Sequence, residues 1–419
     1  VLASALLLVP TLAPAQTFQR SDPAQLGLSS QKLERLSRVL DQYAADRRLA
    51  GGVALVARHG RIAYLHPFGM RDVEANSPMQ ADAIFRIASQ TKALVSVGIM
   101  MLMEDGQLLL GDPVGKYIPQ YMKTKVAVAK EGGGYDVVDA RRPITIRDLL
   151  THTAGIHYGL SGTAREEWVR AGMVGWYFAD RNEPVDSIVV RLAALPFETQ
   201  PGERFVYGYA TDILGVVIER VSGLSLDEFL RRRILQPLKM NDTHFYLPPE
   251  KRNRLTTVYS SKDDGTITRA PDGGGMAHQG NYVDGPRKAF GGGAGLLSTA
   301  TDYARFLQML LNGGELDGVR LLSPASVKLM TSDHVSNYLG ADRGFGLGFE
   351  TIEDVGAYGQ PASEGAFGWG GAYHSSYWVD PAEGLVVVYL TQLAPARGVD
   401  DFGKLRALIY SSIVASGKK

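Results

Sequence analysis

The sequence predicts an α+β protein: a central antiparallel sheet built from both chain ends and flanked by helices, with an inserted, mainly α-helical region. Two observations predict this. Hairpin patterns rich in β-branched residues lie towards both ends of the 419-residue chain, and the stretch between them is dominated by helical patterns. Such an order favours one sheet made from both ends over two consecutive domains. We expect residues 16–100 and 290–419 to form the α/β part and residues 101–289 the mainly helical part, with a cleft between them.

The first residues are an apolar stretch that ends in Ala13-Pro14-Ala15, just ahead of Gln16. An apolar run followed by an A-x-A pattern is typical of an export signal. We therefore expect residues 1–15 to be a signal peptide and the mature chain, residues 16–419, to be periplasmic or secreted in a bacterium. An apolar N-terminus without this role is the alternative. No later run reaches about 18 uninterrupted apolar residues, so no membrane span is expected in the mature chain.

The elements at the two ends follow from local patterns. The segment "SSQKLERLSRVLDQYAADRRL" predicts a first helix behind a serine cap, because its apolar residues recur at helical spacing. These residues are Leu33, Leu36, Val39, Leu40 and Tyr43. Two β-rich runs around His59-Gly60 predict one hairpin, and two more across Pro381 to Gly384 predict a second. The segment "DDFGKLRALIYSSIVAS" predicts a closing helix.

The middle of the chain has weak strand signals. Four segments have helical patterns: "TIRDLLTHT", "EPVDSIVVRLAAL", "ATDILGVVIERVSG" and "LDEFLRRRIL". Two glycine-rich loops, "EGGGYD" and "APDGGGMAHQGNYVDG", are expected to wall the cleft.

The composition excludes some classes of function. Lys plus Arg and Asp plus Glu both number 44, so nothing in the balance attracts a polyanion, and nucleic acid is not an expected partner. The chain has no cysteine and therefore no disulfide, which is compatible with the periplasm or the cytoplasm. A content of 45% apolar residues is enough for a sizeable core.

The stretch "IASQTKAL", residues 87–94, places a lysine in an otherwise apolar run that continues for another turn or more. A helix starting near Ser89 should be packed on most sides, so Lys92 is not expected to be freely solvated. Positions i and i+3 share a helix face, which puts Ser89 beside Lys92. A lysine whose pKa is depressed can take the proton of a serine and make it a nucleophile. The alternative is a plain N-cap serine and a snorkelling lysine.

The pattern S-x-x-K is weak on its own. Three further blocks accompany it in this chain: "ITIRDLLTHTAGI", "PGERFVYGYATDILGVVIE" and "FGWGGAYHSSYWVDP". Together the four blocks resemble the serine β-lactamase and penicillin-binding protein superfamily, in particular the class C-like branch that includes the family VIII carboxylesterases. The resemblance extends over nearly all of the mature chain, in the right order. It implies a β-lactamase-like fold, with the active site in the cleft between the two parts.

The resemblance also implies site residues. Ser89 and Lys92 match the S-x-x-K pair, and Tyr207 matches the first residue of the Tyr-x-Asn motif. By the same alignment, the backbone N–H groups of Ser89 and Ala372 would form the oxyanion hole. Tyr209 stands where β-lactamases of this branch have Asn, so it is a departure from the motif and a candidate substrate contact.

A second departure concerns the substrate. Trp369, Gly370 and Gly371 occupy the Lys-Thr-Gly position, as in the esterase subgroup. The cation and hydroxyl of Lys-Thr-Gly help to receive a β-lactam carboxylate, whereas an indole presents an apolar face. We therefore expect neutral acyl groups to be favoured, with small β-lactams as poor side substrates. His374, three residues after the triplet, is expected to restore a polar contact.

Each residue also has a structural alternative. Tyr207 is alternatively a core tyrosine satisfied by a carbonyl, and Trp369 simple packing beside turn glycines. His152 and His157 suggest a metal pair, but the spacing of HExxH is absent, so no metal is expected. No serine has glycine two before and two after it, so the nucleophile elbow of α/β-hydrolases is absent.

The expected function is that of a serine carboxylesterase acting on a small-molecule ester through an acyl-enzyme, without a cofactor. In this interpretation Lys92 and Tyr207 together take the proton of Ser89, and Tyr207 protonates the leaving alkoxide. Three alternatives stay open: a β-lactamase or D-alanyl-D-alanine peptidase, an acyltransferase or amidase on the same site, and a non-catalytic sensor. The presence of both Lys92 and Tyr207 argues against the sensor.

Overall fold

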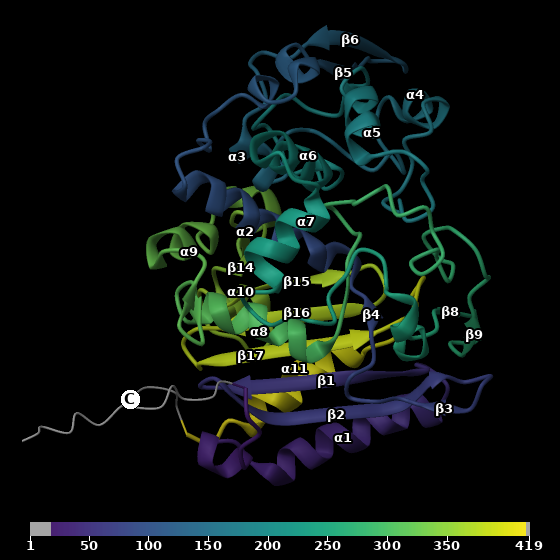
Figure 1. The fold of residues 1–419 in the computed structure, drawn as a ribbon, viewed down its shortest axis with the longest axis vertical. Helices are drawn as coiled ribbons and strands as arrows, with labels where there is room; N and C mark the ends of the chain where they lie inside the picture. Colours follow the sequence, from purple (N-terminus) through teal and green to yellow (C-terminus); the bar gives the residue numbers. More distant parts are fainter. Residues whose placement is uncertain (1–17, 416–419) are drawn as a thin grey trace, which may run out of the picture.

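A computed structural model describes residues 18–415. The expected signal peptide, residues 1–15, lies outside the described residues and stays a prediction. The main sheet has eight strands, and Figure 1 shows it crossing the lower half of the molecule. In sheet order they are β13 (Arg343–Phe345), β14 (Glu350–Ile352), β15 (Phe367–Gly371), β16 (Ser375–Asp380), β17 (Leu385–Thr391), β1 (Gly51–Arg58), β2 (Arg61–Asp72) and β3 (Ser77–Pro78).

The two chain ends meet in the middle of this sheet. β1 pairs antiparallel with β17, with Val53 opposite Leu390. Both strands are fully buried, because alternate residues face two different cores. This confirms the expected α+β fold with a sheet built from both ends and a helical insertion. Both predicted hairpins are present as well, as β1–β2 and β16–β17.

Helices cover both faces of the sheet. α1 (Ser30–Ala45) and α11 (Asp401–Ser412) pack together on one face, and α8 (Ala300–Leu311) packs on β17 and β1 from the other (Figure 1). The side chain of Ser29 caps α1 by accepting a hydrogen bond from Lys32 N, as the sequence predicted. The closing helix is also found where its pattern placed it.

The helical region lies above the α8 face and contains all four segments predicted from their spacing. Its longer helices are α2 (Thr91–Glu104), α5 (Val185–Leu192) and α6 (Ala210–Ser222), and α2 packs against α6. Its shorter α-helices are α3 (Ile146–Leu150), α4 (Arg165–Arg170) and α7 (Leu226–Leu230). Two more short α-helices, α9 (Pro324–Met330) and α10 (Val355–Tyr358), belong to the C-terminal part of the chain. Within residues 18–415, no helix is both long and apolar enough to cross a bilayer.

Small sheets complete the fold, and the sequence patterns missed them. They consist of β4 (Phe85–Arg86) with β10 (Leu297–Ser298), of β5 (Lys125–Ala129) with β6 (Tyr135–Asp139) and β7 (Pro196–Phe197), of β8 (Tyr259–Ser261) with β9 (Ile267–Arg269), and of β11 (Glu315–Leu316) with β12 (Val319–Arg320). The loop "EGGGYD" is the turn between β5 and β6, at the end of the molecule opposite α1 (Figure 1). The glycines of this loop had predicted that it walls the cleft beside the sheet, and this prediction is wrong.

Candidate active site

Ser89 lies in η2 (Ala88–Gln90), a single 3-10 turn that leads directly into α2. Ala88 has a left-handed backbone, with φ of 42°, and is fully buried. This conformation costs a non-glycine residue about 1–2 kcal/mol, so packed neighbours must hold it. Ser89 itself is partly exposed, whereas Ala88 and Gln90 on either side are buried.

Lys92 is 2% exposed, which confirms that it is not a freely solvated lysine. Its Nζ lies 3.3 Å from Ser89 Oγ, 2.8 Å from Tyr158 Oη and 2.7 Å from the carbonyl oxygen of Gly293. A buried amino group needs such partners, because leaving it unpaired costs several kcal/mol. A carbonyl oxygen only accepts, so one N–H of Lys92 is fixed on Gly293.

These three contacts suit a proton transfer from Ser89. A neutral amine has two hydrogens and one lone pair, and Gly293 O and Tyr158 Oη are placed to accept the two hydrogens. The lone pair is then left for Ser89 Oγ, the third neighbour. Burial raises the pKa of Tyr158, and neighbouring Tyr207 and Asp212 raise it further, so Tyr158 is a neutral phenol.

Tyr207 lies two residues ahead of the N-cap position of α6, and its ring lies beside the amino group of Lys92, with 4.6 Å from Nζ to the ring centroid. Its hydroxyl oxygen accepts a hydrogen bond of 3.0 Å from Trp369 Nε1. An indole N–H is a donor only, so the phenol proton of Tyr207 remains free to be given to another group. Gly208 permits this placement, because a Cβ there would come within 2.3 Å of the carbonyl oxygen of Ile156.

Trp369, Gly370 and Gly371 form the end of β15. β16 pairs along the whole of this strand, whereas β14 pairs with Phe367 and Gly368. In the described part of the chain, no strand covers the other edge of residues 369–371. Gly371 also lets β15 lie against the segment before Ser89, because a Cβ there would come within 2.6 Å of the carbonyl oxygen of Ile87. The nucleophile candidate therefore lies next to an open backbone edge.

The two residues that follow β17, Gln392 and Leu393, hydrogen-bond to the two chain segments that carry the expected oxyanion donors. Leu393 N donates to the carbonyl oxygen of Tyr373, at 3.0 Å, next to the exposed Ala372. The side chain of Gln392 accepts from Arg86 N at 3.1 Å and donates to Arg86 O at 3.0 Å, three residues before the nucleophile candidate. The two backbone segments are thus fixed to one point of the sheet. The oxyanion role of their N–H groups stays a prediction.

Tyr209 is not placed as the sequence suggested. It is 2% exposed, its hydroxyl donates to the carbonyl oxygen of Gly175, and its ring stacks with Trp168 and Phe178. A tyrosine buried in this way has no surface to offer a substrate. The departure from the Tyr-x-Asn motif thus adds an aromatic core residue behind Tyr207.

His374 also differs from the expectation of a substrate contact. Its Nε2 lies 2.7 Å from a carboxylate oxygen of Asp401, and its ring stacks on Phe402 with centroids 4.2 Å apart. Both partners belong to α11, on the far face of the sheet from α8. His374 therefore anchors the β15–β16 turn to α11 instead of contacting Ser89.

The two histidines of "THTAGIHYG" lie in different surroundings. His152 packs against Tyr207, with centroids 4.7 Å apart, and burial holds its pKa well below the usual range. His157 packs on Trp168 and accepts from Gly159 N at 2.8 Å. Within residues 18–415, no group of three or more His, Cys, Asp or Glu side chains is arranged to hold a metal ion.

The comparisons with known proteins agree with this geometry. The family model described as beta-lactamase matches residues 36–409, nearly the whole chain. The protein belongs to the beta-lactamase family. Esterase EstB of Burkholderia gladioli is 33% identical over 383 residues, which cover 89% of this chain and 94% of EstB. Lovastatin esterase of Penicillium rubens is 30% identical and covers 81% of this chain and 88% of its own.

Solved structures of this beta-lactamase family show the same fold. EstCE1, described as a hydrolase with promiscuous acyltransferase activity, is 29% identical, with a TM-score of 0.76, and the match covers 92% of this chain and 99% of EstCE1. Enzymes named as acyltransferases are also among the relatives. The protein is thus a beta-lactamase family hydrolase, esterase or acyltransferase.

The structure of this beta-lactamase family member adds site residues that the sequence patterns missed. They are Tyr158 and Gly293, which contact Lys92, and Asp212, whose Oδ1 accepts from Gly293 N at 2.9 Å. Burial raises the pKa of Asp212 to about 6, opposed by the nearby Lys92 and by the Gly293 N–H. A signal existed for Asp212, because an acidic residue inside the apolar face of α6 is as unusual as Lys92 in α2.

Proposed function

We propose that the protein is a serine carboxylesterase that hydrolyses short-chain neutral esters through an acyl-enzyme on Ser89. One observation carries the proposal: buried Lys92 Nζ lies within hydrogen-bond distance of Gly293 O, Tyr158 Oη and Ser89 Oγ. As a neutral amine it can give its two hydrogens to the first two oxygens and turn its lone pair to the third. The EstB and lovastatin esterase relatives support an ester as the substrate.

The proposed reaction has two halves. Ser89 Oγ gives its proton to the Lys92–Tyr207 pair and attacks the ester carbonyl, and the N–H groups of Ser89 and Ala372 hold the oxyanion. Tyr207 then donates its phenol proton to the leaving alkoxide, which its hydrogen bond from Trp369 leaves it free to do. Water attacks the acyl-enzyme by the same steps in reverse.

The preference for neutral substrates follows from the strand beside Ser89. Trp369 stands where Lys-Thr-Gly would supply a cation, and its one donor is already used on Tyr207. His374 offers no contact there, because its Nε2 is bound to Asp401 of α11. A carboxylate entering this cleft would be desolvated without a partner, so β-lactams should react slowly.

A second candidate is acyl transfer to an alcohol, which the likeness to EstCE1 favours. Both functions share the acyl-enzyme and differ in the nucleophile of the second step. Product analysis with p-nitrophenyl butyrate in water containing 1-propanol separates them, since transfer gives propyl butyrate and hydrolysis gives butyrate.

The proposal is tested by labelling with a fluorophosphonate and measuring intact mass and the modified peptide. We expect one phosphonyl group on Ser89 of the wild type and none on Ser89→Ala. The substitution should abolish ester hydrolysis without unfolding the protein, because a helix-start hydroxyl contributes at most about 1–2 kcal/mol. Ser411→Ala, at an exposed serine of α11, is the matched control and should keep full activity. A folded Ser89→Ala variant that still hydrolyses esters would exclude this nucleophile.

A further inference from the structure

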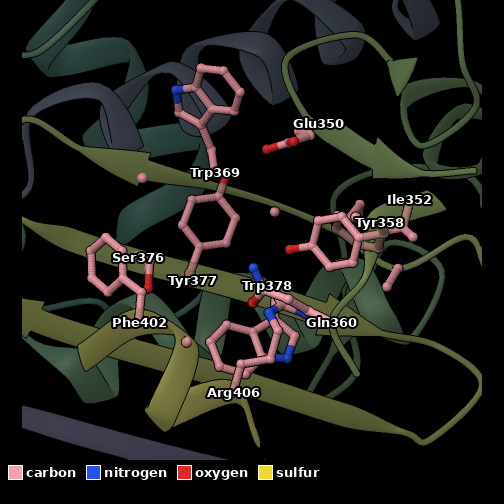
Figure 2. Close-up of a pocket in the computed structure, with 15 residues that line it drawn as sticks. Glu350, Ile352, Tyr358, Gln360, Trp369, Ser376, Tyr377, Trp378, Phe402 and Arg406 are labelled. Atoms are coloured by element: carbon pink, nitrogen blue, oxygen red, sulfur yellow. The ribbon is translucent and has the colours of Figure 1, made fainter. Parts of the chain in front are cut away.

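A cavity of about 290 Å³ lies between β15 and α11, on the face of the sheet that α11 covers. Figure 2 shows Tyr358 and Phe402 on opposite sides of it and Arg406 at its base. Trp369 contributes to one wall, and its indole hydrogen-bonds Tyr207 in the candidate active site. The cavity and the candidate active site therefore share β15. Their charged residues are different: Glu350 and Arg406 line the cavity, whereas Lys92 and Asp212 belong to the candidate active site.

Glycines create the space. Gly368 and Gly370 of β15 and Gly403 of α11 all line the cavity, where ordinary side chains would fill it. A Cβ on Gly403 would meet nothing within 4 Å, so a larger side chain there has open space in front of it.

Arg406 gives the cavity a charge without a counter-charge. Its guanidinium lies 4.4 Å from the ring centroid of Trp378 and donates a long hydrogen bond, of 3.4 Å, to the carbonyl oxygen of Pro361. Among the described residues, no carboxylate forms an ion pair with it. A guanidinium has five donors in a planar fork that matches a carboxylate, so most of its capacity is unused here.

One carboxylate also lines the cavity, and it is paired with an arginine that binds Asp342 as well. Glu350 accepts a hydrogen bond of 2.9 Å from Arg343, a residue outside the cavity lining. Burial raises the pKa of Glu350, opposed by Arg343 and, more weakly, by Arg406. Of the two charged residues in the lining, Arg406 is therefore the one without an ion pair among the described residues.

The walls around Arg406 are aromatic. Tyr358 and Trp378 line the cavity, and both rings lie within cation–π distance of the guanidinium, at 5.4 and 4.4 Å to their centroids. Flat apolar walls favour a flat apolar ligand, whose rings stack well on aromatic side chains. The single cation at the base sets the position of one anionic group.

We propose that this cavity is a second binding site, for small carboxylic acids that carry an aromatic or similarly flat apolar body. The carboxylate pairs with Arg406, and the body lies between Tyr358 and Phe402 over Gly368 and Gly370. This inference does not depend on the reaction proposed for Ser89, because it concerns binding on the other face of β15.

The test is a ¹⁹F NMR titration with 4-fluorophenylacetate as the probe. We expect saturable binding with a Kd below about 1 mM, and at least about tenfold weaker binding of the neutral isostere 4-fluorophenylacetamide, because charge-assisted hydrogen bonds are the stronger ones. No saturation up to about 10 mM, or equal binding of acid and amide, would overturn the proposal.

Variants assign the binding to this cavity. Arg406→Gln keeps the length and polarity of the side chain and should weaken the acid at least about tenfold. Gly403→Leu should abolish binding by filling the space, while Gly403→Ala, its control for helix propensity, should bind nearly as well as the wild type. Arg397→Gln, at an exposed arginine paired with Asp263, controls for charge and should leave binding unchanged. Unchanged binding in both Arg406→Gln and folded Gly403→Leu would place the acid elsewhere and overturn the proposal.

Ester hydrolysis measured on the same variants separates this inference from the proposed function. Arg406 and Gly403 have no contact with Ser89, Lys92 or Tyr207, so hydrolysis should stay within about twofold. Loss of binding with hydrolysis intact supports the second site whether or not the acyl-enzyme is correct.

Discussion

The chemistry of the candidate site depends on how the amino group of Lys92 is shared. Three oxygen atoms surround its Nζ, and two of them, Gly293 O and Tyr158 Oη, are fixed by buried structure. Gly293 is held in turn by Asp212. These buried contacts therefore set the position of Lys92, and Ser89 is the neighbour that we propose to react.

Tyr158 should consequently act as a positioning residue. We expect Tyr158→Phe to lower kcat for a p-nitrophenyl ester about 10- to 100-fold with little change in KM, because one N–H of Lys92 loses its acceptor and a buried donor left unsatisfied costs about 1–3 kcal/mol. Tyr207→Phe should cost several orders of magnitude, since it removes the proton donor itself. Steady-state kinetics over a range of pH measures both.

Two comparisons make this prediction specific. Tyr121→Phe removes another buried hydroxyl, which donates to the carbonyl oxygen of Val189 in the helical region, and should leave kcat unchanged. The double variant Lys92→Ala, Tyr207→Phe should be little worse than either single one, because residues that act as a unit are non-additive. Multiplicative losses would show that the two residues do not share a proton path.

The sequence placed Ser89 beside Lys92, as the structure shows, but it did not reveal the distant residues that contact Lys92. Ser89 and Lys92 are three apart on one helical turn, so local geometry alone brings them together. Tyr158 and Gly293 reach Lys92 from 66 and 201 residues away, and such contacts leave no periodic pattern. Tyr209 and His374 were assigned to the substrate by alignment, but long-range packing on Trp168 and on Asp401 determines what they contact.

At the level of elements, β15 must lie close to η2 for its backbone to face Ser89. Gly371 makes this approach possible. We expect Gly371→Ala to lower kcat/KM about 100-fold or more, since its Cβ would be 2.6 Å from Ile87 O and would push the strand away, and a misplacement of about 1 Å can cost that much. Thermal unfolding should show a folded protein with a lowered Tm.

Gly370→Ala is the matched neighbour. Its Cβ would meet Ser375 O at 3.0 Å, a contact that a small shift relieves, so activity should fall less than about fivefold. Equal losses in the two variants would mean that the distance between β15 and η2 does not control the reaction.

Elements with a long, regular pattern were predicted and those defined by tertiary contacts were missed. The amphipathic repeat of α1 and the alternating runs of both hairpins are readable locally. β5 and β6 escaped notice because Gly132, Gly133 and Gly134 all have positive φ and form a turn that resembles an open loop in sequence. The two-residue strands exist through pairing with distant partners, as in β4 with β10.

For the whole molecule, the sheet built from both chain ends brings together groups that are far apart in sequence. Ser89 follows the N-terminal strands, whereas Trp369 belongs to the C-terminal ones, and Tyr207 comes from the inserted helical region. The candidate active site thus receives its proposed nucleophile, proton donor and substrate edge from three segments. Its selectivity depends on which side chains each segment contributes.

Since the C-terminal segment contributes an indole where a cation would receive a carboxylate, we expect kcat/KM for p-nitrophenyl butyrate to exceed that for nitrocefin by at least about 100-fold, or about 2.7 kcal/mol of transition-state stabilisation. An unpaired carboxylate entering a partly desolvated cleft costs free energy of that order. Trp369→Lys should narrow the gap, chiefly by slowing the ester reaction, because Tyr207 loses the donor that now holds its oxygen at 3.0 Å. Parallel assays of both substrates on wild type and variant measure the ratio. If the wild type hydrolysed nitrocefin as fast as the ester, the family's lactamase activity would be the better assignment for this chain.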